Sequence, residues 1–295
     1  MKHNRLGKSD LKVSEIGFGC MSLPPDERLT TQILERAVAL GVTFFDTADL
    51  YDQGDNERVV GAALGSVRKE IVLASKVGNR WNPGGNDWRW DASPEWIKEG
   101  VYRSLERLQT DYLDLYQLHG GTLEDDLEAS FEAFEDLQRE GVIYSYGISS
   151  IRPNVIRRVA ELGISSNMMQ YSLLDRRPEE EALEILAGKI GVIARGPVAK
   201  GLLASKPAAK YLTHSAAEVA AVQEVLSEMA SPTRSNAQLA LRFALSHEAV
   251  ATVIPGASTL AQLEDNMGAA NVTLSEAEIS KLKKATPART YQQHR

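Results

Sequence analysis

The sequence predicts an α/β chain that folds as a (β/α)8 TIM barrel, capped by an N-terminal β-hairpin and extended by two extra helices. Short apolar, β-rich runs recur along the 295 residues, and longer segments with helical spacing lie between them. Strands that alternate with helices indicate βαβ units and parallel pairing. Eight such units close into a barrel of about 250 residues. Since no linker or internal repeat divides the sequence, we expect a single domain over 1–295.

The predicted strands follow the apolar runs in chain order. They cover 15–19, 42–46, 70–77, 112–119, 142–149, 168–172, 191–196 and 250–256. The alternative architecture is an open, doubly wound sheet. Such sheets often carry a GxGxxG motif after the first strand, and this sequence has none there, which favours the barrel.

Two of the predicted barrel helices have clear boundary signals. Ser93 is a suitable N-cap, and Pro94 at the next position is preorganised for the first helical turn. In segment 123–141, apolar residues recur every three or four positions, and Gly141 supplies a stop signal. The acidic residues of that segment then form the solvated face of an amphipathic helix.

The remaining elements lie outside the regular alternation. The segment RLGKSDLKV at 5–13 contains a glycine and a Ser-Asp pair between short extended stretches, which predicts the N-terminal hairpin. Helical spacing also predicts the two extra helices, near 215–230 and 275–285.

Composition restricts the function classes. The chain has 43% hydrophobic and 25% charged residues, a net charge of −7 and a pI of about 5.4, so no basic footprint indicates nucleic acid or an anionic membrane. The start MKHNRLGKSD has no apolar signal core, and no run approaches the ~20 apolar residues of a membrane span. The single cysteine excludes an intrachain disulfide, and the histidines show no metal-ligand spacing. We expect a cytoplasmic enzyme without a metal, although a cytoplasmic scaffold fits the composition equally well.

Titratable side chains gather where three predicted strands end. The stretch FFDTADLYDQGDNE contains Asp46 and Tyr51 directly after the second strand, Lys76 closes the third strand, and His119 closes the fourth. Active sites of barrels are built at the carboxyl ends of the strands, so these four side chains should meet in one mouth. Each alone is more often structural than catalytic.

Together the four residues form a set suited to proton transfer. A tyrosine has a pKa of about 10 and is a poor acid at neutral pH, but a nearby ammonium favours the phenolate. Asp46 would hold Lys76 charged and in place, and His119 would orient the substrate oxygen or help move the proton. The set predicts proton transfer at a carbonyl or alcohol oxygen.

At these residues the chain resembles the aldo-keto reductase superfamily, in its bacterial NADPH-dependent type. The resemblance extends from about Arg5 to Asn271 and includes GVTFFDTADLY, LASKVG and DYLDLYQLH. It implies hydride transfer from C4 of a nicotinamide to a carbonyl without a metal. It also implies the catalytic tetrad Asp46, Tyr51, Lys76 and His119, with Tyr51 as the proton donor.

The resemblance further implies a cofactor site, with some departures. Ser149 and Gln170 match residues that hold the nicotinamide amide, but Ser150 stands where Asn is usual, and Arg195 stands where an aromatic residue usually stacks. Arg195 would stack on the ring through its planar guanidinium, or form a salt bridge with an acid of the barrel mouth. The other implied cofactor contacts are Cys20, Met21, Gly196, Pro197, Val198, Lys200, Gly201, Leu202, Ser258, Gln262, Asp265 and Asn266.

The implied cofactor is NADPH, with NADH possible. Relatives often carry a cation near the eighth strand for the 2′-phosphate, and the segment from Gly256 to Gln262 has none. The amides at the start of the last barrel helix would attract phosphate without a lysine. Cys20 is interpreted as a small pocket-lining residue rather than a nucleophile.

The loop at 79–91 predicts the substrate class. It follows the third strand and holds Trp81, Trp88 and Trp90, three of the four tryptophans. They would either pin the loop to the barrel rim or, with Met21, line an apolar wall of the substrate site. The tail TPARTYQQHR is too short for a long specificity loop, which would leave the pocket open on one side.

We therefore expect reduction of small, apolar or aromatic aldehydes and ketones. Two alternatives stay open at this point: a nucleotide-binding regulatory subunit of a membrane channel, and a polyol or sugar-alcohol dehydrogenase. The expected partner is a small carbonyl substrate, with no nucleic acid or membrane, and a monomer is the expected state.

Overall fold

A computed structural model describes residues 1–82 and 84–295, and within them a sheet of eight parallel strands forms a barrel. The sheet order is β12-β11-β10-β9-β8-β5-β4-β3. The strands are β3 (Phe18–Gly19), β4 (Phe44–Asp46), β5 (Val72–Val77), β8 (Leu113–Leu118), β9 (Ile143–Ser149), β10 (Ser166–Gln170), β11 (Gly191–Arg195) and β12 (Val250–Ile254).

The first and last strands meet at a seam that closes the sheet on itself. Ile16 forms a parallel bridge with Val253. The Gly17 N–H donates to the Val253 carbonyl at 2.8 Å, and the Val253 N–H donates to the Glu15 carbonyl at 3.0 Å. The predicted barrel is therefore confirmed, and the open doubly wound sheet is excluded.

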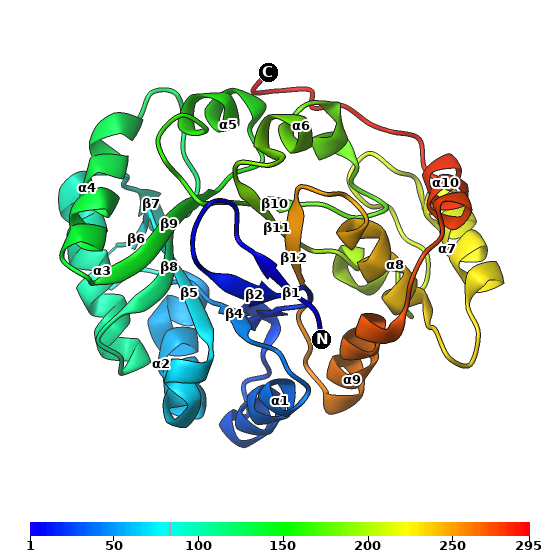
Figure 1. The fold of residues 1–295 in the computed structure, drawn as a ribbon, viewed down its shortest axis with the longest axis horizontal. Coiled ribbons are helices and arrows are strands. Elements are labelled where there is room, and N and C mark those ends of the chain that lie inside the picture. Colours follow the sequence, from blue (N-terminus) through cyan, green and yellow to red (C-terminus); the bar gives the residue numbers. More distant parts are fainter. Residues whose placement is uncertain (83) are drawn as a thin grey trace.

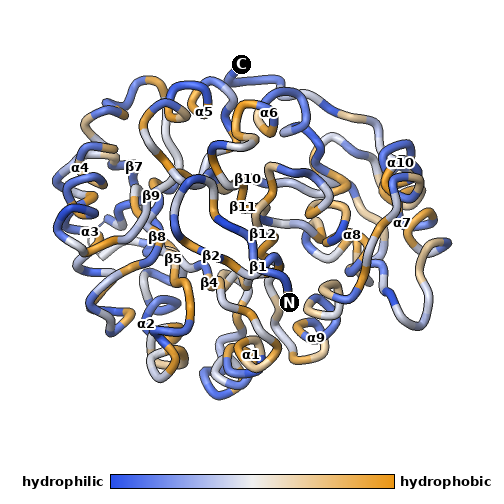
Figure 2. The backbone as a smooth tube through the Cα atoms, viewed as in Figure 1, coloured by the Kyte–Doolittle hydropathy of each residue, from blue (hydrophilic) through white to orange (hydrophobic). Residues whose placement is uncertain are grey.

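Helices surround the barrel (Figure 1), and their hydrophilic and hydrophobic residues alternate along each helix (Figure 2), as amphipathic helices require. The barrel helices are α1 (Glu27–Ala39), α2 (Asp55–Leu64), α3 (Pro94–Leu108), α4 (Leu127–Arg139), α5 (Pro153–Val159), α6 (Ala182–Leu186), α8 (Asn236–Leu245) and α9 (Leu260–Gly268). The extra helices are α7 (Ala216–Met229) and α10 (Glu276–Ala285), close to their predicted positions. Ser93 caps α3 as predicted, accepting from the Trp96 N–H at 3.3 Å.

The predicted N-terminal hairpin covers one end of the barrel (Figure 1). It consists of β1 (His3–Arg5) and β2 (Lys12–Ser14), which pair antiparallel. The Asn4 side chain donates to the Ala251 carbonyl at 2.8 Å, and Leu6 and Val13 are fully buried in the inner core. The hairpin therefore seals the barrel at the end opposite the strand termini that carry the site.

Two features differ from the predicted elements. The segment predicted as a tryptophan loop contains a second antiparallel hairpin, β6 (Asn79–Trp81) paired with β7 (Trp88–Trp90). In addition, the sixth barrel strand begins at Ser166, two residues earlier than predicted. Ser166 and Asn167 are fully buried, but they are polar, so a prediction based on apolar runs placed the start of the strand after them.

Candidate active site

The four predicted catalytic side chains come together at the carboxyl end of the barrel. Asp46 ends β4, Lys76 lies near the end of β5, His119 directly follows β8, and Tyr51 begins a short 3-10 turn after β4. The Lys76 Nζ donates to Asp46 Oδ2 at 2.7 Å, to the Thr47 carbonyl at 2.6 Å and to Tyr51 Oη at 3.3 Å. Lys76 is therefore the centre of the site.

Burial governs the charges of this centre. Lys76 is 0% exposed. Burial alone would lower the pKa of its ammonium, but the carboxylate of Asp46 and the oxygen of Tyr51 outweigh that effect and raise the pKa, so Lys76 carries a charge. Burial raises the pKa of Tyr51, and the ammonium of Lys76 opposes this increase. The phenol is therefore protonated at neutral pH, and a positive charge already stands beside its oxygen.

His119 is a neutral imidazole beside Tyr51. The two rings meet edge to face, with centroids 5.9 Å apart and an interplanar angle of 83°. Burial, together with the charges of Lys76 and Arg195, holds the pKa of His119 well below its usual range. Within the described part of the chain, its buried Nδ1 has no hydrogen-bond partner. A neutral imidazole carries one N–H donor, and the prediction that His119 orients a substrate oxygen requires that N–H to face it.

The predicted nicotinamide contacts lie at the ends of three neighbouring strands. Ser149 ends β9, Gln170 ends β10 and Arg195 ends β11. Arg195 donates to the side-chain oxygen of Gln170 at 3.2 Å, and Gln170 donates to the Tyr211 hydroxyl at 3.0 Å. Among the described residues no acid pairs with Arg195, so the salt bridge considered from the sequence is replaced by this amide contact. Tyr211 had no sequence signal that linked it to the site.

Ser150 occupies a position with its own structural contacts. Its hydroxyl accepts from the Arg152 N–H at 3.2 Å, and its carbonyl accepts from the side chain of Asn167 at 3.1 Å. The buried side-chain oxygen of Asn167 has no hydrogen-bond partner among the described residues. Sequence analysis missed Asn167, because an asparagine inside a buried strand resembles a surface residue in the sequence.

The segment after β11 has an unusual run of left-handed backbone conformations. Gly196, Ala199, Lys200 and Gly201 all have positive φ, at 63°, 48°, 58° and 92°. Within this turn the Ala199 N–H donates to the Gly196 carbonyl at 3.0 Å and the Gly201 N–H donates to the Val198 carbonyl at 2.9 Å, so a phosphate contact here stays a prediction. The predicted contacts Pro197, Val198 and Leu202 belong to the same segment, and Lys200 is exposed.

The predicted contacts near α9 are already engaged within the fold. Gln262 Oε1 accepts from the Ser258 N–H at 2.9 Å, and Thr259 caps the helix. Asp265 Oδ1 accepts from the side chain of Gln238 at 3.0 Å, and the Asn266 side chain donates to the Gly256 carbonyl at 3.3 Å. These contacts order the start of α9, and the adenine contacts of Asp265 and Asn266 stay a prediction.

Cys20 and Met21 differ sharply in exposure. Cys20 is fully buried in the core, where burial raises the pKa of its thiol, and Met21 is 66% exposed. Met21 is therefore accessible to a ligand, and a contact between Cys20 and a cofactor stays a prediction.

The tryptophan hairpin turns one face toward the site. Directly opposed residues share a face, so Trp81 lies beside Trp88, and Asn79 lies beside Trp90. The Trp90 ring packs against Gly78 and Gly120, where an added Cβ would lie 2.6 Å and 3.0 Å from it, and its Nε1 donates to Asp125 at 2.9 Å. Since Gly120 adjoins His119, this face borders the active site. Trp90 anchors the hairpin, whereas Trp88 is 48% exposed.

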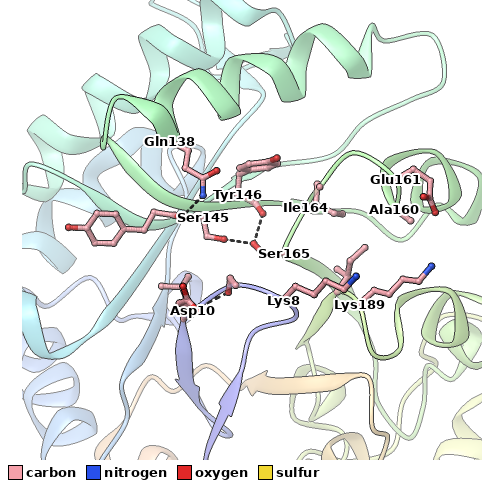
Figure 3. A pocket seen from close by; sticks show the side chains of 15 residues that line it. Lys8, Asp10, Gln138, Ser145, Tyr146, Ala160, Glu161, Ile164, Ser165 and Lys189 are labelled. Atoms are coloured by element: carbon pink, nitrogen blue, oxygen red, sulfur yellow. Dashed lines mark hydrogen bonds between the residues drawn. The ribbon is translucent and has the colours of Figure 1, made fainter.

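A cavity of about 670 Å³ lies at the other end of the barrel (Figure 3). It lies between the N-terminal hairpin, which contributes Lys8 and Asp10, and the segments that enter β9 to β11, which contribute Ser145, Ser165 and Lys189. No tetrad residue lines it. Its size is therefore no guide to the position of the chemistry.

Searches within the described residues bear on membranes and metals. No helix there is long and apolar enough to cross a membrane, and no cluster of three His, Cys, Asp or Glu side chains is placed to hold a metal ion.

The fold and the site define the class of protein as an oxidoreductase built on a (β/α)8 barrel. The model of the Aldo/keto reductase family matches residues 15–287. The chain is 49% identical to the uncharacterized oxidoreductase YqkF of Bacillus subtilis, with 100% of both chains covered. It is 30% identical to probable aldo-keto reductase 1 of Glycine max, over 96% of this chain and 88% of that protein. The chain belongs to the aldo/keto reductase family.

Solved structures agree with this assignment. Aldo-keto reductase AKR11C1 from Bacillus halodurans in its holo form has 48% sequence identity and a TM-score of 0.94, covering 100% of this chain and 99% of that one. The apo form of the same protein has a TM-score of 0.85 at 46% identity, with the same coverage. Members of the family are oxidoreductases that use nicotinamide cofactors.

Proposed function

We propose that the protein reduces small, apolar or aromatic aldehydes and ketones to alcohols with NADPH, and that Tyr51 donates the proton to the carbonyl oxygen. The observation that carries the proposal is the position of Lys76, whose buried ammonium contacts both Asp46 and Tyr51. In the reaction the phenol loses its proton as the carbonyl oxygen gains negative charge. Because the ammonium already lies 3.3 Å from the phenol oxygen, the developing phenolate is stabilised without rearrangement.

The residues around the strand ends fit a nicotinamide dinucleotide. Ser149 and Gln170 offer hydrogen bonds for the amide of the ring, and the exposed ammonium of Lys200, on the turn from Gly196 to Gly201, would contact the pyrophosphate. When bound, the cofactor supplies the hydride. Arg195 would lie flat against the ring, held by its bond to Gln170.

The preference for NADPH rests on family evidence and on one side chain. A relative from Schizosaccharomyces pombe, 28% identical over 92% of this chain and 88% of that protein, is named aldo-keto reductase yakc [NADP(+)]. Lys200 is the cation of the phosphate segment, and no cation lies between 256 and 262. We therefore propose a modest preference for NADPH, with NADH also accepted.

The proposed substrate class is inferred from exposed apolar side chains that follow the carboxyl ends of two barrel strands. Met21 and Trp88 are exposed large apolar side chains, and Trp81 shares a face with Trp88. Such a surface favours apolar or aromatic groups next to the carbonyl and offers few hydrogen bonds for a free sugar.

Steady-state kinetics on a panel of aldehydes and ketones, with NADPH and NADH in parallel, test the proposal. The Tyr51→Phe variant should lose about 10²–10⁴-fold in activity and keep its cofactor affinity, measured by quenching of tryptophan fluorescence. Activity of the variant within threefold of the wild type would remove Tyr51 from the role of acid. Equal affinity for the two cofactors would contradict the NADPH preference.

A further inference from the structure

A buried ion pair lies directly behind the catalytic centre, between α2 and α3. Glu57 on α2 is fully buried, and its Oε2 accepts from Arg107 Nε of α3 at 2.6 Å. Its other carboxylate oxygen accepts from the hydroxyl of Ser75. Ser75 precedes Lys76 in β5 and is also fully buried. The carboxylate therefore anchors the side chain of Ser75, the β5 residue next to the catalytic lysine.

The same ion pair touches the turn that carries Tyr51. The turn Tyr51–Gly54 has three consecutive residues with positive φ: Asp52 at 48°, Gln53 at 56° and Gly54 at 94°. Such a backbone is strained for the two non-glycine residues and persists only where its surroundings fix it. A Cβ added to Gly54 would lie 2.7 Å from Arg107 Cδ and 2.8 Å from its Nε. The Arg107 side chain thus lies directly against this turn.

We propose that the Glu57–Arg107 pair is a positioning element that sets the distance between Tyr51 and Lys76. The pair reaches β5 through Ser75, and it reaches the Tyr51 turn through Gly54. The contact it sets is the 3.3 Å separation between the Lys76 Nζ and the Tyr51 Oη. The inference rests on the proposed role of Tyr51 as proton donor. Neither Glu57 nor Arg107 touches the reacting atoms.

A purely structural ion pair would also join α2 to α3, so stability alone does not separate the two roles. The separating quantity is the rate of hydride transfer in a single turnover, followed by NADPH absorbance with a saturating aromatic aldehyde. Cofactor affinity is measured on the same samples. A shift of Tyr51 away from Lys76 slows the chemical step. The proposed nicotinamide contacts lie on β9 to β11, on other strands of the barrel, so the same shift should leave cofactor affinity unchanged.

The test compares Arg107→Met, Arg107→Lys and Glu57→Gln with the control Arg103→Met. Arg103 lies on the same helix and pairs with Glu99 at the surface. We expect Arg107→Met and Glu57→Gln to slow the single turnover at least tenfold, with the Kd for NADPH within twofold of the wild type. Arg107→Lys should turn over at least threefold faster than Arg107→Met, and Arg103→Met should turn over at the wild-type rate.

A glycine pair keeps the proposal testable if Arg107→Met does not fold. Gly54→Ala should slow the turnover at least tenfold, because its methyl group would meet Arg107. The control is Gly141→Ala, since Gly141 also has a positive φ, of 76°, but has open space around it. Equal effects of the two substitutions would overturn the inference.

The remaining outcomes also decide the question. Variants at Glu57 and Arg107 that melt earlier but turn over within twofold of the wild type, while folded, would show a structural role only. A fall in cofactor affinity parallel to the rate would place their effect in the cofactor site. Tyr51→Phe, measured alongside, separates the two proposals. If this variant stays active, the proton-donor role is wrong. If it is inactive while the Glu57 and Arg107 variants stay active, only the positioning role is wrong.

Discussion

Replacement of Lys76 by methionine tests the catalytic centre and the fold at once. Lys76 is fully buried and donates to Asp46 at 2.7 Å and to the Thr47 carbonyl at 2.6 Å. Methionine keeps much of the side-chain volume and removes the charge. In the variant, the one side-chain hydrogen bond left to the Asp46 carboxylate among the described residues comes from Gln117, at 3.4 Å.

The expected loss of stability follows from this geometry. Two unit charges 2.7 Å apart attract each other by about 6 kcal/mol at an effective dielectric constant of about 20. Desolvation of both groups offsets part of that attraction, but the variant leaves Asp46 buried and uncompensated. We therefore expect the free energy of unfolding to fall by about 3–5 kcal/mol. The double variant Asp46→Asn/Lys76→Met has no buried charge left and should recover about 1–3 kcal/mol of the loss.

Urea unfolding, followed by tryptophan fluorescence, measures these differences. The control is Lys98→Met, because Lys98 lies 2.6 Å from Asp136 but is 41% exposed, and solvent screens its ion pair. That variant should unfold at nearly the wild-type urea concentration. Reduction by Lys76→Met should fall by about 10²–10⁴-fold, because Tyr51 then loses the charge that stabilises its phenolate. A stability loss no larger than that of Lys98→Met, or activity close to the wild type, would refute the reasoning.

Further predictions concern pH, cofactor and substrate. Burial keeps His119 neutral and raises the pKa of the Tyr51 phenol. The rate of reduction should therefore be constant from about pH 6 to 9 and decline only at higher pH, where Tyr51 loses its proton. A change in rate near the ordinary histidine pKa of ~6.5 would contradict this. Lys200→Ala should weaken NADPH binding by on the order of 1–3 kcal/mol in a fluorescence titration, and an unchanged Kd would exclude a phosphate contact. Trp81→Ala or Trp88→Ala should raise the KM for a benzaldehyde-type substrate more than for a very small aldehyde, whereas Trp90→Ala should chiefly lower the melting temperature. If none of the three changes either KM, the hairpin is structural only.

Much of this architecture was predictable because local signals and the global fold agree. The apolar runs marked all the barrel strands, and the titratable residues that follow them coincide with the strand ends in the structure. Ser93 and Pro94 fixed the start of α3 because capping is a local effect. The meeting of Asp46, Lys76 and Tyr51 followed from the geometry of parallel barrels, in which all strands end at the same rim.

The unpredicted features depend on contacts between distant segments. Glu57 was visible only as one acid in a charged stretch, and its partner Arg107 lies 50 positions later on another helix. The β6–β7 hairpin was missed because the proline and glycines of 79–91 suggested an irregular loop, although the alternation in NRW and WRW around a Gly-Gly pair was a usable signal. The link between Arg195 and Gln170 needed the three-dimensional order of β10 and β11.

The seam of the barrel has a consequence for how the chain matures during synthesis. The Asn4 side chain bonds to a carbonyl 247 positions later, so the docking surface of the first hairpin is incomplete until β12 has left the ribosome. At about 5–20 residues per second, translation of that stretch takes roughly 10–50 s. Throughout that interval the edge of β3 that faces β12 stays unpaired. The nascent polypeptide therefore carries an open sheet edge, a site for non-native strand pairing, until its final strand arrives.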